Sequence, residues 1–380
     1  GTLFIENVAP DEGLSAPFNS WFTIFGQFFD HGLDSTAKGN AGTVYIPLLP
    51  DDPLYVEGSP TNFMALTRAT NQPGLDGILG TADDVRENNN STTPWIDLNQ
   101  VYTSNQSHQV FLREYIMVDG KPVATGHMLE GAAGGPPTWA DIKAQARTML
   151  GIELSDLDVL RVPSLVTDLY GEFTRGANGL PMLMTAGGAV EGNLAAPVLA
   201  SLAIPAGRAF LDDIAHSAAP GMVDHDRNPG TPMIARTADS DTDTGNVIAP
   251  DAQTGVMLSY DDELLNAHFI VGDGRGNENT ALTSIHTIFH SEHNNQVDSI
   301  KTLVQTSGDL AFINSWLLVP LAELPAADAV LTWDGERLFQ AARFSTEQVY
   351  QHLVFEEFVR LVSPNIDAFV FSNTVDIDPA

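Results

Sequence analysis

Residues 21–36 read WFTIFGQFFDHGLDST, and this stretch decides which fold class we expect. Its large apolar side chains recur at the spacing of an α-helix, and Asn19 and Ser20 just before it offer capping groups. We therefore predict a helix over residues 15–31 with a strongly buried aromatic face.

Three polar residues lie beside that aromatic face. At about 100° per residue, Gln27, Asp30 and His31 fall on one arc of the predicted helix. Polar side chains next to a buried face indicate that they point into a site. A histidine in this setting is nevertheless more often a hydrogen-bonded structural residue, so a functional interpretation needs a second group.

Residues 272–279, which read GDGRGNEN, offer that second group. Arg275 lies in a glycine-flanked turn just before a predicted helix, where backbone geometry can hold its guanidinium in place. Glu278 follows three residues later, on roughly the same side if the helix has begun. The two segments together could supply a base and a cation to one reaction.

The last third of the chain is also strongly helical. Apolar residues keep a helical period through residues 280–303. A second long helix is predicted from Asp334, a residue suited to the N-cap, to Val362, with Pro364 as its stop. Shorter helical stretches are expected at residues 95–115, 139–150 and 195–215. Strand signals are few and short, so the predicted class is mainly α, with long irregular loops.

The chain shows no internal repeat and no clean linker. Residues 40–94 are rich in loop signals, and residues 116–260 are rich in glycine, proline and alanine. We therefore predict a single domain over residues 1–380 with a long, irregular insertion at about 116–260.

The composition excludes several classes of protein. The chain has 17 Lys and Arg against 49 Asp and Glu, so its net charge at pH 7 is 17 − 49 = −32. So acidic a chain repels phosphate backbones and anionic membranes, and we expect no nucleic-acid partner. No run of about 18 apolar residues exists, so no membrane span is expected. The absence of cysteine excludes disulfides and cysteine nucleophiles.

Four motifs in order resemble the animal-type haem peroxidases, the peroxidase–cyclooxygenase superfamily. They are residues 21–36, 93–104 (TPWIDLNQVYTS), 275–294 (RGNENTALTSIHTIFHSEHN) and 333–338 (WDGERL). The resemblance runs from about residue 15 to the C-terminus, with 116–260 the poorly matched part. It favours the bacterial members, which are often embedded in long secreted proteins, so an extracellular location is expected.

The resemblance implies a catalytic role for three residues. His31 would be the distal histidine, which takes a proton from the bound peroxide and returns it to the leaving oxygen. Arg275 would be the distal arginine, which stabilises charge that develops as the oxygen–oxygen bond breaks. Gln27 would line the same pocket and hydrogen-bond water or a halide.

The resemblance also implies how haem would be attached. Asp30 and Glu278 match positions that form ester links to haem methyl groups. Where the mammalian granulocyte enzymes carry a methionine that makes a third link, this sequence has Asn279. That link cannot form here, so we do not expect a chloride oxidant of comparable strength.

Calcium is the second cofactor that the resemblance implies. The matching loop offers oxygen ligands from Thr93, the carbonyl of Trp95, Asp97 and Asn99. The family takes a further carboxylate from the residue after the distal histidine, but here that residue is Gly32. Either Asp34 compensates, or Gly32 contributes only its carbonyl, or the site is weaker. The alternative for the whole loop is a simple turn.

Two further acidic loops are not explained by the animal enzymes. One offers Asp76, Asp83 and Asp84, and the other offers Asp239, Asp241 and Asp243. The second begins like an EF-hand loop, but its glycine falls one place late and its twelfth position is Pro250. Each loop is either an additional calcium site or a solvated acidic loop.

Three histidines, His286, His290 and His293, share one face of the predicted helix. The spacing invites a zinc site, but the family has structural histidines in a similar helix and the sequence has no H-E-x-x-H pattern. We therefore expect structural roles.

The family also requires a proximal histidine that ligates the iron from the other side. After Trp333 the only histidine is His352, inside the predicted helix where the family has no ligand. The chain also opens Gly-Thr-Leu with neither Met nor signal peptide. The expectation is therefore a fragment of a longer secreted protein whose remainder supplies the proximal side.

The expected function is a haem peroxidase that reduces hydrogen peroxide and oxidises small electron donors or halides. Two alternatives remain open. One is a haem-free, calcium-stabilised module for binding or adhesion, and the other is haem held by His352.

Overall fold

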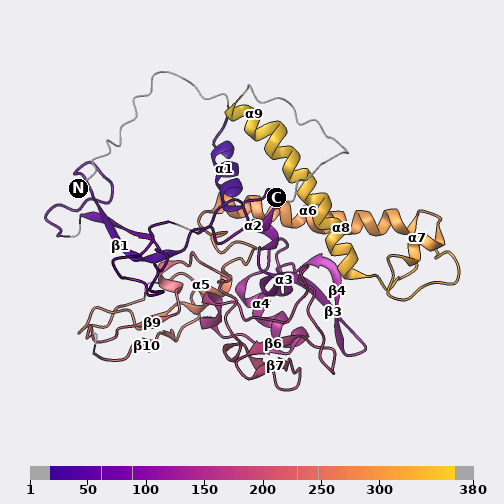
Figure 1. The fold of residues 1–380 in the computed structure, drawn as a ribbon, viewed down its shortest axis with the longest axis horizontal. Coiled ribbons are helices and arrows are strands. Elements are labelled where there is room, and N and C mark those ends of the chain that lie inside the picture. The colour runs from indigo at the N-terminus through magenta and orange to yellow at the C-terminus, as the bar shows by residue number, and fades with distance from the viewer. Residues whose placement is uncertain (1–17, 61, 88, 229, 247, 364–380) are drawn as a thin grey trace. The chain divides into compact units, whose positions relative to one another are not determined.

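The computed structural model describes residues 18–363 except residues 61, 88, 229 and 247 (Figure 1). These residues form two compact units, one of residues 18–21 and 32–95, the other of residues 22–31 and 96–363. Whether the chain acts as a single domain stays a prediction, and each unit is described by itself.

The first unit is built around one antiparallel hairpin. Strand β1 (Lys38–Pro47) pairs with β2 (Phe63–Ala69), and the register shifts between Lys38 and Thr43. Tyr45 and Phe63 meet edge to face across the pair, with ring centroids 5.0 Å apart. The remainder of the described unit is turns and short bridges, as expected for residues 40–94.

The second unit contains the long helices. The predicted helices correspond to α1 (Trp21–His31), α6 (Thr280–Gln305) and α8 (Gly335–His352), which continues through a π-helical segment (Leu353–Phe358) into α9 (Val359–Val362). Asn19 caps α1 by accepting from the Trp21 amide at 3.0 Å, and Asp334 caps α8 by accepting from the Arg337 amide at 3.1 Å. Residues 15–17 and Pro364 lie outside the described residues.

Shorter helices fill the second unit. They are α2 (Asn99–Tyr102), α3 (Gln106–Leu112), α4 (Trp139–Gln145) with a π-helical turn (Ala146–Leu150), α5 (Asp262–Ala267) and α7 (Leu310–Asn314). Three 3₁₀ turns cover Asp156–Leu160, Ala200–Leu202 and His216–Ala218. The predictions at 95–115 and 139–150 are thus confirmed, the first as two helices.

The helix predicted at 195–215 is wrong. The segment contains a two-residue strand and a 3₁₀ turn, and the chain is extended around them. Pro197 and Pro205 lack the amide that a helix needs, and Gly207 has φ of 72°, so the alanines between them cannot extend a helix.

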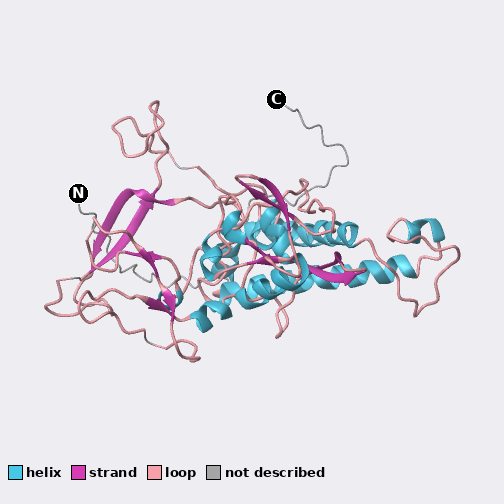
Figure 2. Ribbon diagram, turned by 90° about the horizontal axis from the view of Figure 1, so that it is seen from below, coloured by secondary structure: helices cyan, strands magenta, loops and turns pink. Residues whose placement is uncertain are grey.

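The strands of the second unit are short and form separate pairs (Figure 2). They are β3 (Arg113–Val118), β4 (Lys121–Met128), β5 (Ile152–Glu153), β6 (Met182–Thr185), β7 (Gly188–Glu191), β8 (Val198–Leu199), β9 (Met222–Val223), β10 (Ile234–Ala235), β11 (Thr237–Ala238) and β12 (Ser259–Tyr260). The long elements of this unit are helices, so the mainly-α class is confirmed.

An aromatic cluster holds α1, α6 and α8 together. Phe28 of α1 is fully buried and stacks on Phe289 of α6, with centroids 5.1 Å apart and planes within 5°. Tyr350 of α8 meets Phe28 edge-on at 5.9 Å. Gln100 donates from one amide nitrogen to both the Phe28 carbonyl and the Tyr350 hydroxyl, each at 3.0 Å. This packing fully buries Phe28 and partly buries Phe25 and Phe29, whereas Trp21 is exposed, so the predicted aromatic face of α1 is less buried than expected. It still fixes where the polar arc of the helix lies.

Gly335 is the glycine of the WDGERL motif, and its close packing explains why a larger residue does not fit there. A Cβ at this position would overlap the carbonyl oxygen of Ala124 in β4. Only glycine therefore permits the start of α8 to lie against β4.

Candidate functional site

The last turns of α1 meet the turn that precedes α6. Gln27 donates to Glu278 Oε2 at 2.5 Å, and His31 Nε2 lies 3.5 Å from the same oxygen. Arg275 donates from a terminal nitrogen to the His31 carbonyl at 3.3 Å. We call Gln27, His31, Asp273, Arg275 and Glu278 the histidine–arginine cluster. The structure thus brings together the two predicted segments, although some 244 residues separate them in the chain.

Asp273 holds the guanidinium of Arg275 in place. Arg275 Nε donates to Asp273 Oδ1 at 2.8 Å, a terminal nitrogen donates to Oδ2 at 2.7 Å, and the Arg275 amide also donates to Oδ1 at 2.9 Å. Such a bidentate pair fixes position as well as charge. Burial opposes ionisation of both groups, but the pair lowers the pKa of Asp273 and raises that of Arg275, so both are charged at neutral pH.

His31 is a buried, neutral base. Its exposed fraction is 4%. Burial lowers its pKa, and the positive charge of Arg275 lowers it further, against the opposing charges of Asp273, Glu278 and Asp30. Nδ1 has no hydrogen-bond partner among the described residues. The uncharged ring can therefore accept a proton at neutral pH.

Asn279 holds Gln27 from the other side. Its side-chain nitrogen donates to Gln27 Oε1 at 3.0 Å, while its oxygen accepts from the Leu282 amide at 2.9 Å and caps α6. Gln27 therefore has its oxygen bound by Asn279 and its nitrogen bound by Glu278. Asp30, in contrast, lies on the exposed side of α1.

Sequence reasoning missed the roles of Asp273 and Asn279. Asp273 precedes Arg275 by two residues within a glycine-rich turn, a spacing that lets one carboxylate reach both the amide and the guanidinium. Asn279 stands directly before a helical run, which is the usual place for a capping residue. Both signals are local and could have been recognised.

The predicted calcium loop spans the boundary between the two units. In the first unit the Trp95 amide donates to Thr93 Oγ1 at 3.1 Å. In the second unit Asp97 Oδ1 accepts from the Asn99 amide at 3.2 Å and from its side-chain nitrogen at 2.9 Å. Gly32 and Asp34 belong to the first unit. The shared ligand set therefore stays a prediction.

The acidic loop at residues 76–84 uses its carboxylates within the turn. Asp83 accepts from Thr81 Oγ1 at 2.7 Å and from the Asp76 amide at 3.3 Å, and the Thr81 bond is the first cause of its lowered pKa. Asp84 accepts from the Gly80 amide at 2.9 Å. No group of three metal-ligating side chains forms here among the described residues. A calcium site in this loop stays a prediction.

The second acidic loop is differently arranged. Asp239 groups with Asp262 and Glu263, whereas Asp241 and Asp243 are absent from the one three-ligand group that the described residues form.

The histidines on α6 each have separate surroundings. His293 Nδ1 lies 2.8 Å from the Tyr102 hydroxyl and its Nε2 lies 3.0 Å from the Gly126 carbonyl. His290 Nε2 lies 2.9 Å from the Leu129 carbonyl. His286 meets Phe28 edge-on at 4.9 Å. In the part of the chain that the structure describes, these three histidines do not come close enough together to form a group of metal ligands, and their structural roles stay a prediction.

His352 is engaged on its own helix. Its Nδ1 lies 3.1 Å from Glu356 Oε1, and both side chains are exposed. This pairing gives no support to haem ligation by His352.

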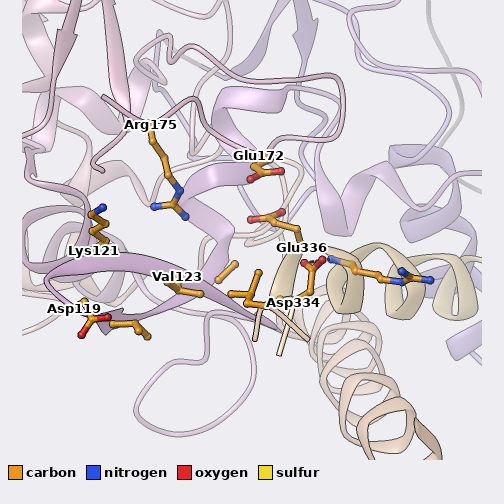
Figure 3. A pocket seen from close by; sticks show the side chains of 12 residues that line it. Asp119, Lys121, Val123, Glu172, Arg175, Asp334 and Glu336 are labelled. Carbon is orange, nitrogen blue, oxygen red and sulfur yellow. Dashed lines mark hydrogen bonds between the residues drawn. The ribbon is translucent and has the colours of Figure 1, made fainter. Parts of the chain in front are cut away.

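A separate cavity of about 500 Å³ lies between the β3–β4 hairpin, the loop that carries Glu172 and Arg175, and the start of α8 (Figure 3). Glu172, Arg175 and Glu336 point into it. Arg175 donates to the carbonyls of Pro122 and Gly179 at 2.7 and 2.9 Å, and Glu336 forms an ion pair with Arg113. None of its lining residues belongs to the histidine–arginine cluster.

None of the helices in the described part of the chain is both long enough and apolar enough to cross a membrane.

The fold and the cluster define a mainly helical protein with a buried neutral histidine beside an ion-paired arginine. The family model described as animal haem peroxidase matches residues 4–129 and 236–370, which is more than half of the chain. The chain therefore belongs to the animal haem peroxidase family. The unmatched residues between these segments fall within the predicted insertion at 116–260. The comparison with curated protein sequences found no match to the chain.

Three solved structures are similar to the chain. Peroxidase A from Dictyostelium discoideum is 16% identical, with a TM-score of 0.40, and the match covers 90% of this chain and 40% of that one. The fatty acid alpha-dioxygenases of Arabidopsis thaliana and Oryza sativa are 11% and 12% identical, with TM-scores of 0.35 and 0.34. Those matches cover 93% and 92% of this chain and 29% of each dioxygenase. The chain thus spans less than half the length of these structures.

Proposed function

We propose that this chain supplies the peroxide-binding side of a haem peroxidase that reduces hydrogen peroxide and oxidises a small electron donor or halide. The observation that carries the proposal is a neutral, buried His31 next to Arg275, whose position is set by Asp273. A base and a fixed cation within one site are what acid–base cleavage of a peroxide requires.

The residues of the cluster fit a haem. His31 keeps one buried ring nitrogen without a hydrogen-bond partner among the described residues, which leaves it available to a bound peroxide. Glu278 and Asp30 are exposed carboxylates on the two segments that form the site. Haem would supply the redox-active iron at which the oxygen–oxygen bond is broken.

Each residue then has a defined task. His31 takes a proton from one oxygen of the peroxide and delivers it to the other oxygen, which leaves as water. Arg275 stabilises the negative charge that develops during cleavage. Gln27, held by Glu278 and Asn279, presents its amide to water or a halide.

The iron ligand on the opposite side is proposed to come from the remainder of a longer secreted polypeptide. A calcium ion at Thr93, Trp95, Asp97 and Asn99, with Gly32 or Asp34, is proposed as a structural cofactor. An extracellular, bacterial setting is proposed because it is rich in calcium and suits a strongly acidic chain.

The test uses the full-length, haem-containing protein. We expect His31→Ala to lower kcat/KM for hydrogen peroxide by about 10²–10⁴-fold, because general acid–base catalysis is lost. The Soret band and haem content should stay unchanged. His352→Ala, which removes an exposed histidine outside the cluster, is the matched control.

Retention of activity in His31→Ala would refute the acid–base role. A full-length protein that lacks Soret absorption yet binds calcium and a carbohydrate or cell surface would favour the haem-free module instead.

Ester attachment of haem has its own test. We propose links through Asp30 and Glu278, which predict a haem that survives acid–acetone extraction. Asp30→Asn and Glu278→Gln should each release part of the attachment, and together they should make the haem fully extractable. Complete extraction from the unaltered protein would contradict the links.

A further inference from the structure

Two short strands bring distant acidic segments to one edge. β11 and β12 pair in parallel, with Thr237 opposite Ser259 and Ala238 opposite Tyr260. The Asp239 amide continues the pairing by donating to the Tyr260 carbonyl at 2.9 Å. Because parallel strands end at the same edge, the residues that follow them, Asp239 and those of 261–263, lie together.

Three carboxylates converge at this edge. Asp239, Asp262 and Glu263 each place one oxygen so that all three lie within 4.8 Å of one another. Like charges at this separation repel one another, and none of the three carboxylates forms an ion pair with a Lys, Arg or His among the described residues.

Four oxygens at this edge are shielded from solvent and unsatisfied, although the residues that carry them are half-buried. Both carboxylate oxygens of Asp239 are shielded from solvent and have no hydrogen-bond partner among the described residues. The same holds for Glu263 Oε2 and Asn246 Oδ1. Buried polar atoms without partners are rare and costly, and a bound cation would satisfy these four acceptor oxygens together.

The neighbouring acids hold the loop in shape. Asp261 accepts from the Gly245 amide and from the Leu264 amide, both at 2.6 Å. Asp241 accepts from the Asp243 amide at 2.9 Å and from the Asn246 side chain at 2.7 Å. Gly245 has φ of 81°, a backbone conformation that favours glycine, so the turn requires glycine at this position, one place later than in an EF-hand loop. Asp241 and Asp261 thus serve the turn itself, whereas Asp239, Asp262 and Glu263 are the carboxylates whose oxygens lie together.

We propose that Asp239, Asp262 and Glu263 bind a calcium ion, with the Asn246 amide oxygen as a further ligand. Carboxylate and amide oxygens are the ligands that Ca²⁺ prefers. The ligands come from two segments and not from the loop alone. The ion therefore fastens the loop 239–246 to the start of α5. The site does not involve haem, and it therefore stands or falls independently of the peroxidase proposal.

The experiment uses the full chain after treatment with a chelator. Calcium binding is measured by isothermal titration calorimetry for the unaltered protein and for Asp239→Asn, Glu263→Gln and Asp97→Asn. Asp243→Asn is the matched control, since it removes the same charge from the same loop at a residue outside the group. We expect Asp239→Asn and Glu263→Gln to lose one calcium ion or weaken it by at least roughly tenfold, and Asp243→Asn to retain it.

Thermal unfolding separates lost binding from lost folding. In chelator, Asp239→Asn should unfold at the same temperature as the unaltered protein or higher, because carboxylate repulsion is relieved. Calcium should raise the unfolding temperature less in this variant than in the unaltered protein. Unchanged calcium affinity and stoichiometry in Asp239→Asn and Glu263→Gln, or no calcium binding by the unaltered protein, would overturn the proposal. Loss of binding in Asp97→Asn alone would also overturn it.

Discussion

At the residue scale, Asp273 acts on both members of the proposed catalytic pair. It binds the guanidinium of Arg275 through two hydrogen bonds, and its negative charge raises the pKa of His31 against burial and the charge of Arg275. We regard Asp273 as a positioning residue, because it acts through these two groups.

Asp273→Asn should impair peroxide cleavage without removing any proposed catalytic group. The single oxygen of an asparagine amide can replace only one of the two carboxylate oxygens that accept from the Arg275 guanidinium. Because Arg275 is then held less firmly, we expect kcat/KM for hydrogen peroxide to fall by up to about 10²-fold. Loss of the negative charge also lowers the pKa of His31. Since the base works in its deprotonated form, the acid limb of the pH–rate profile should move to lower pH.

The control for this change is Asp328→Asn, which neutralises an exposed carboxylate elsewhere. A profile whose acid limb stays in place or moves to higher pH would contradict the role of Asp273.

At the element scale, an ion pair between a buried arginine and a half-buried glutamate joins β3 to α8. Arg113 at the start of β3 is fully buried, pairs with Glu336 in the first turn of α8, and lies 4.2 Å from the ring centre of Phe339. It also donates to the Tyr170 carbonyl at 2.6 Å. Burial lowers its pKa to about 10, so it stays charged at neutral pH. The glutamate of the WDGERL motif therefore has a structural role.

Glu336→Gln should destabilise the protein strongly. The change leaves a buried guanidinium without its counter-charge, which costs about 3 kcal/mol in the free energy of unfolding. Urea denaturation measures this difference, and Glu323→Gln, at an exposed position, is the control. A loss below about 0.5 kcal/mol, typical of a surface substitution, would show that the pair contributes little.

At the scale of the whole molecule, buried neutral histidines govern the response to acid. Burial lowers the pKa of His108, His286 and His293 to about 3 each. The unfolded chain takes up protons at these residues near pH 6.5, while the folded chain does not. His127 behaves in the opposite way, because Glu114 and Asp298 raise its pKa.

The free energy of unfolding should therefore fall as the pH is lowered from 7 to 4. Each buried histidine contributes up to about 1.4 kcal/mol per pH unit below 6.5, and three of them outweigh His127. Urea denaturation at several pH values measures the slope. His108→Leu should make it shallower, whereas His352→Leu at an exposed residue should not. A stability that stays level or rises toward pH 4 would contradict this account.

Local sequence was enough to predict the long helices and four residues of the histidine–arginine cluster, but it missed the role of Asp273. Helical periodicity and the N-cap at Asp334 are properties of neighbouring residues, so α6 and α8 followed directly from the sequence. The same local reasoning failed at 195–215, where spaced prolines outweigh the helical preference of alanine.

Only the tertiary structure decided which distant charges meet. Arg113 and Glu336 come from β3 and α8, and Asp239 joins Asp262 and Glu263 through the pairing of two short strands. Helical periodicity depends on neighbours within a few residues, so it can be read along the chain. The partner of a buried charge depends on how the whole chain packs, and the spacing of residues in the sequence carries no information about that.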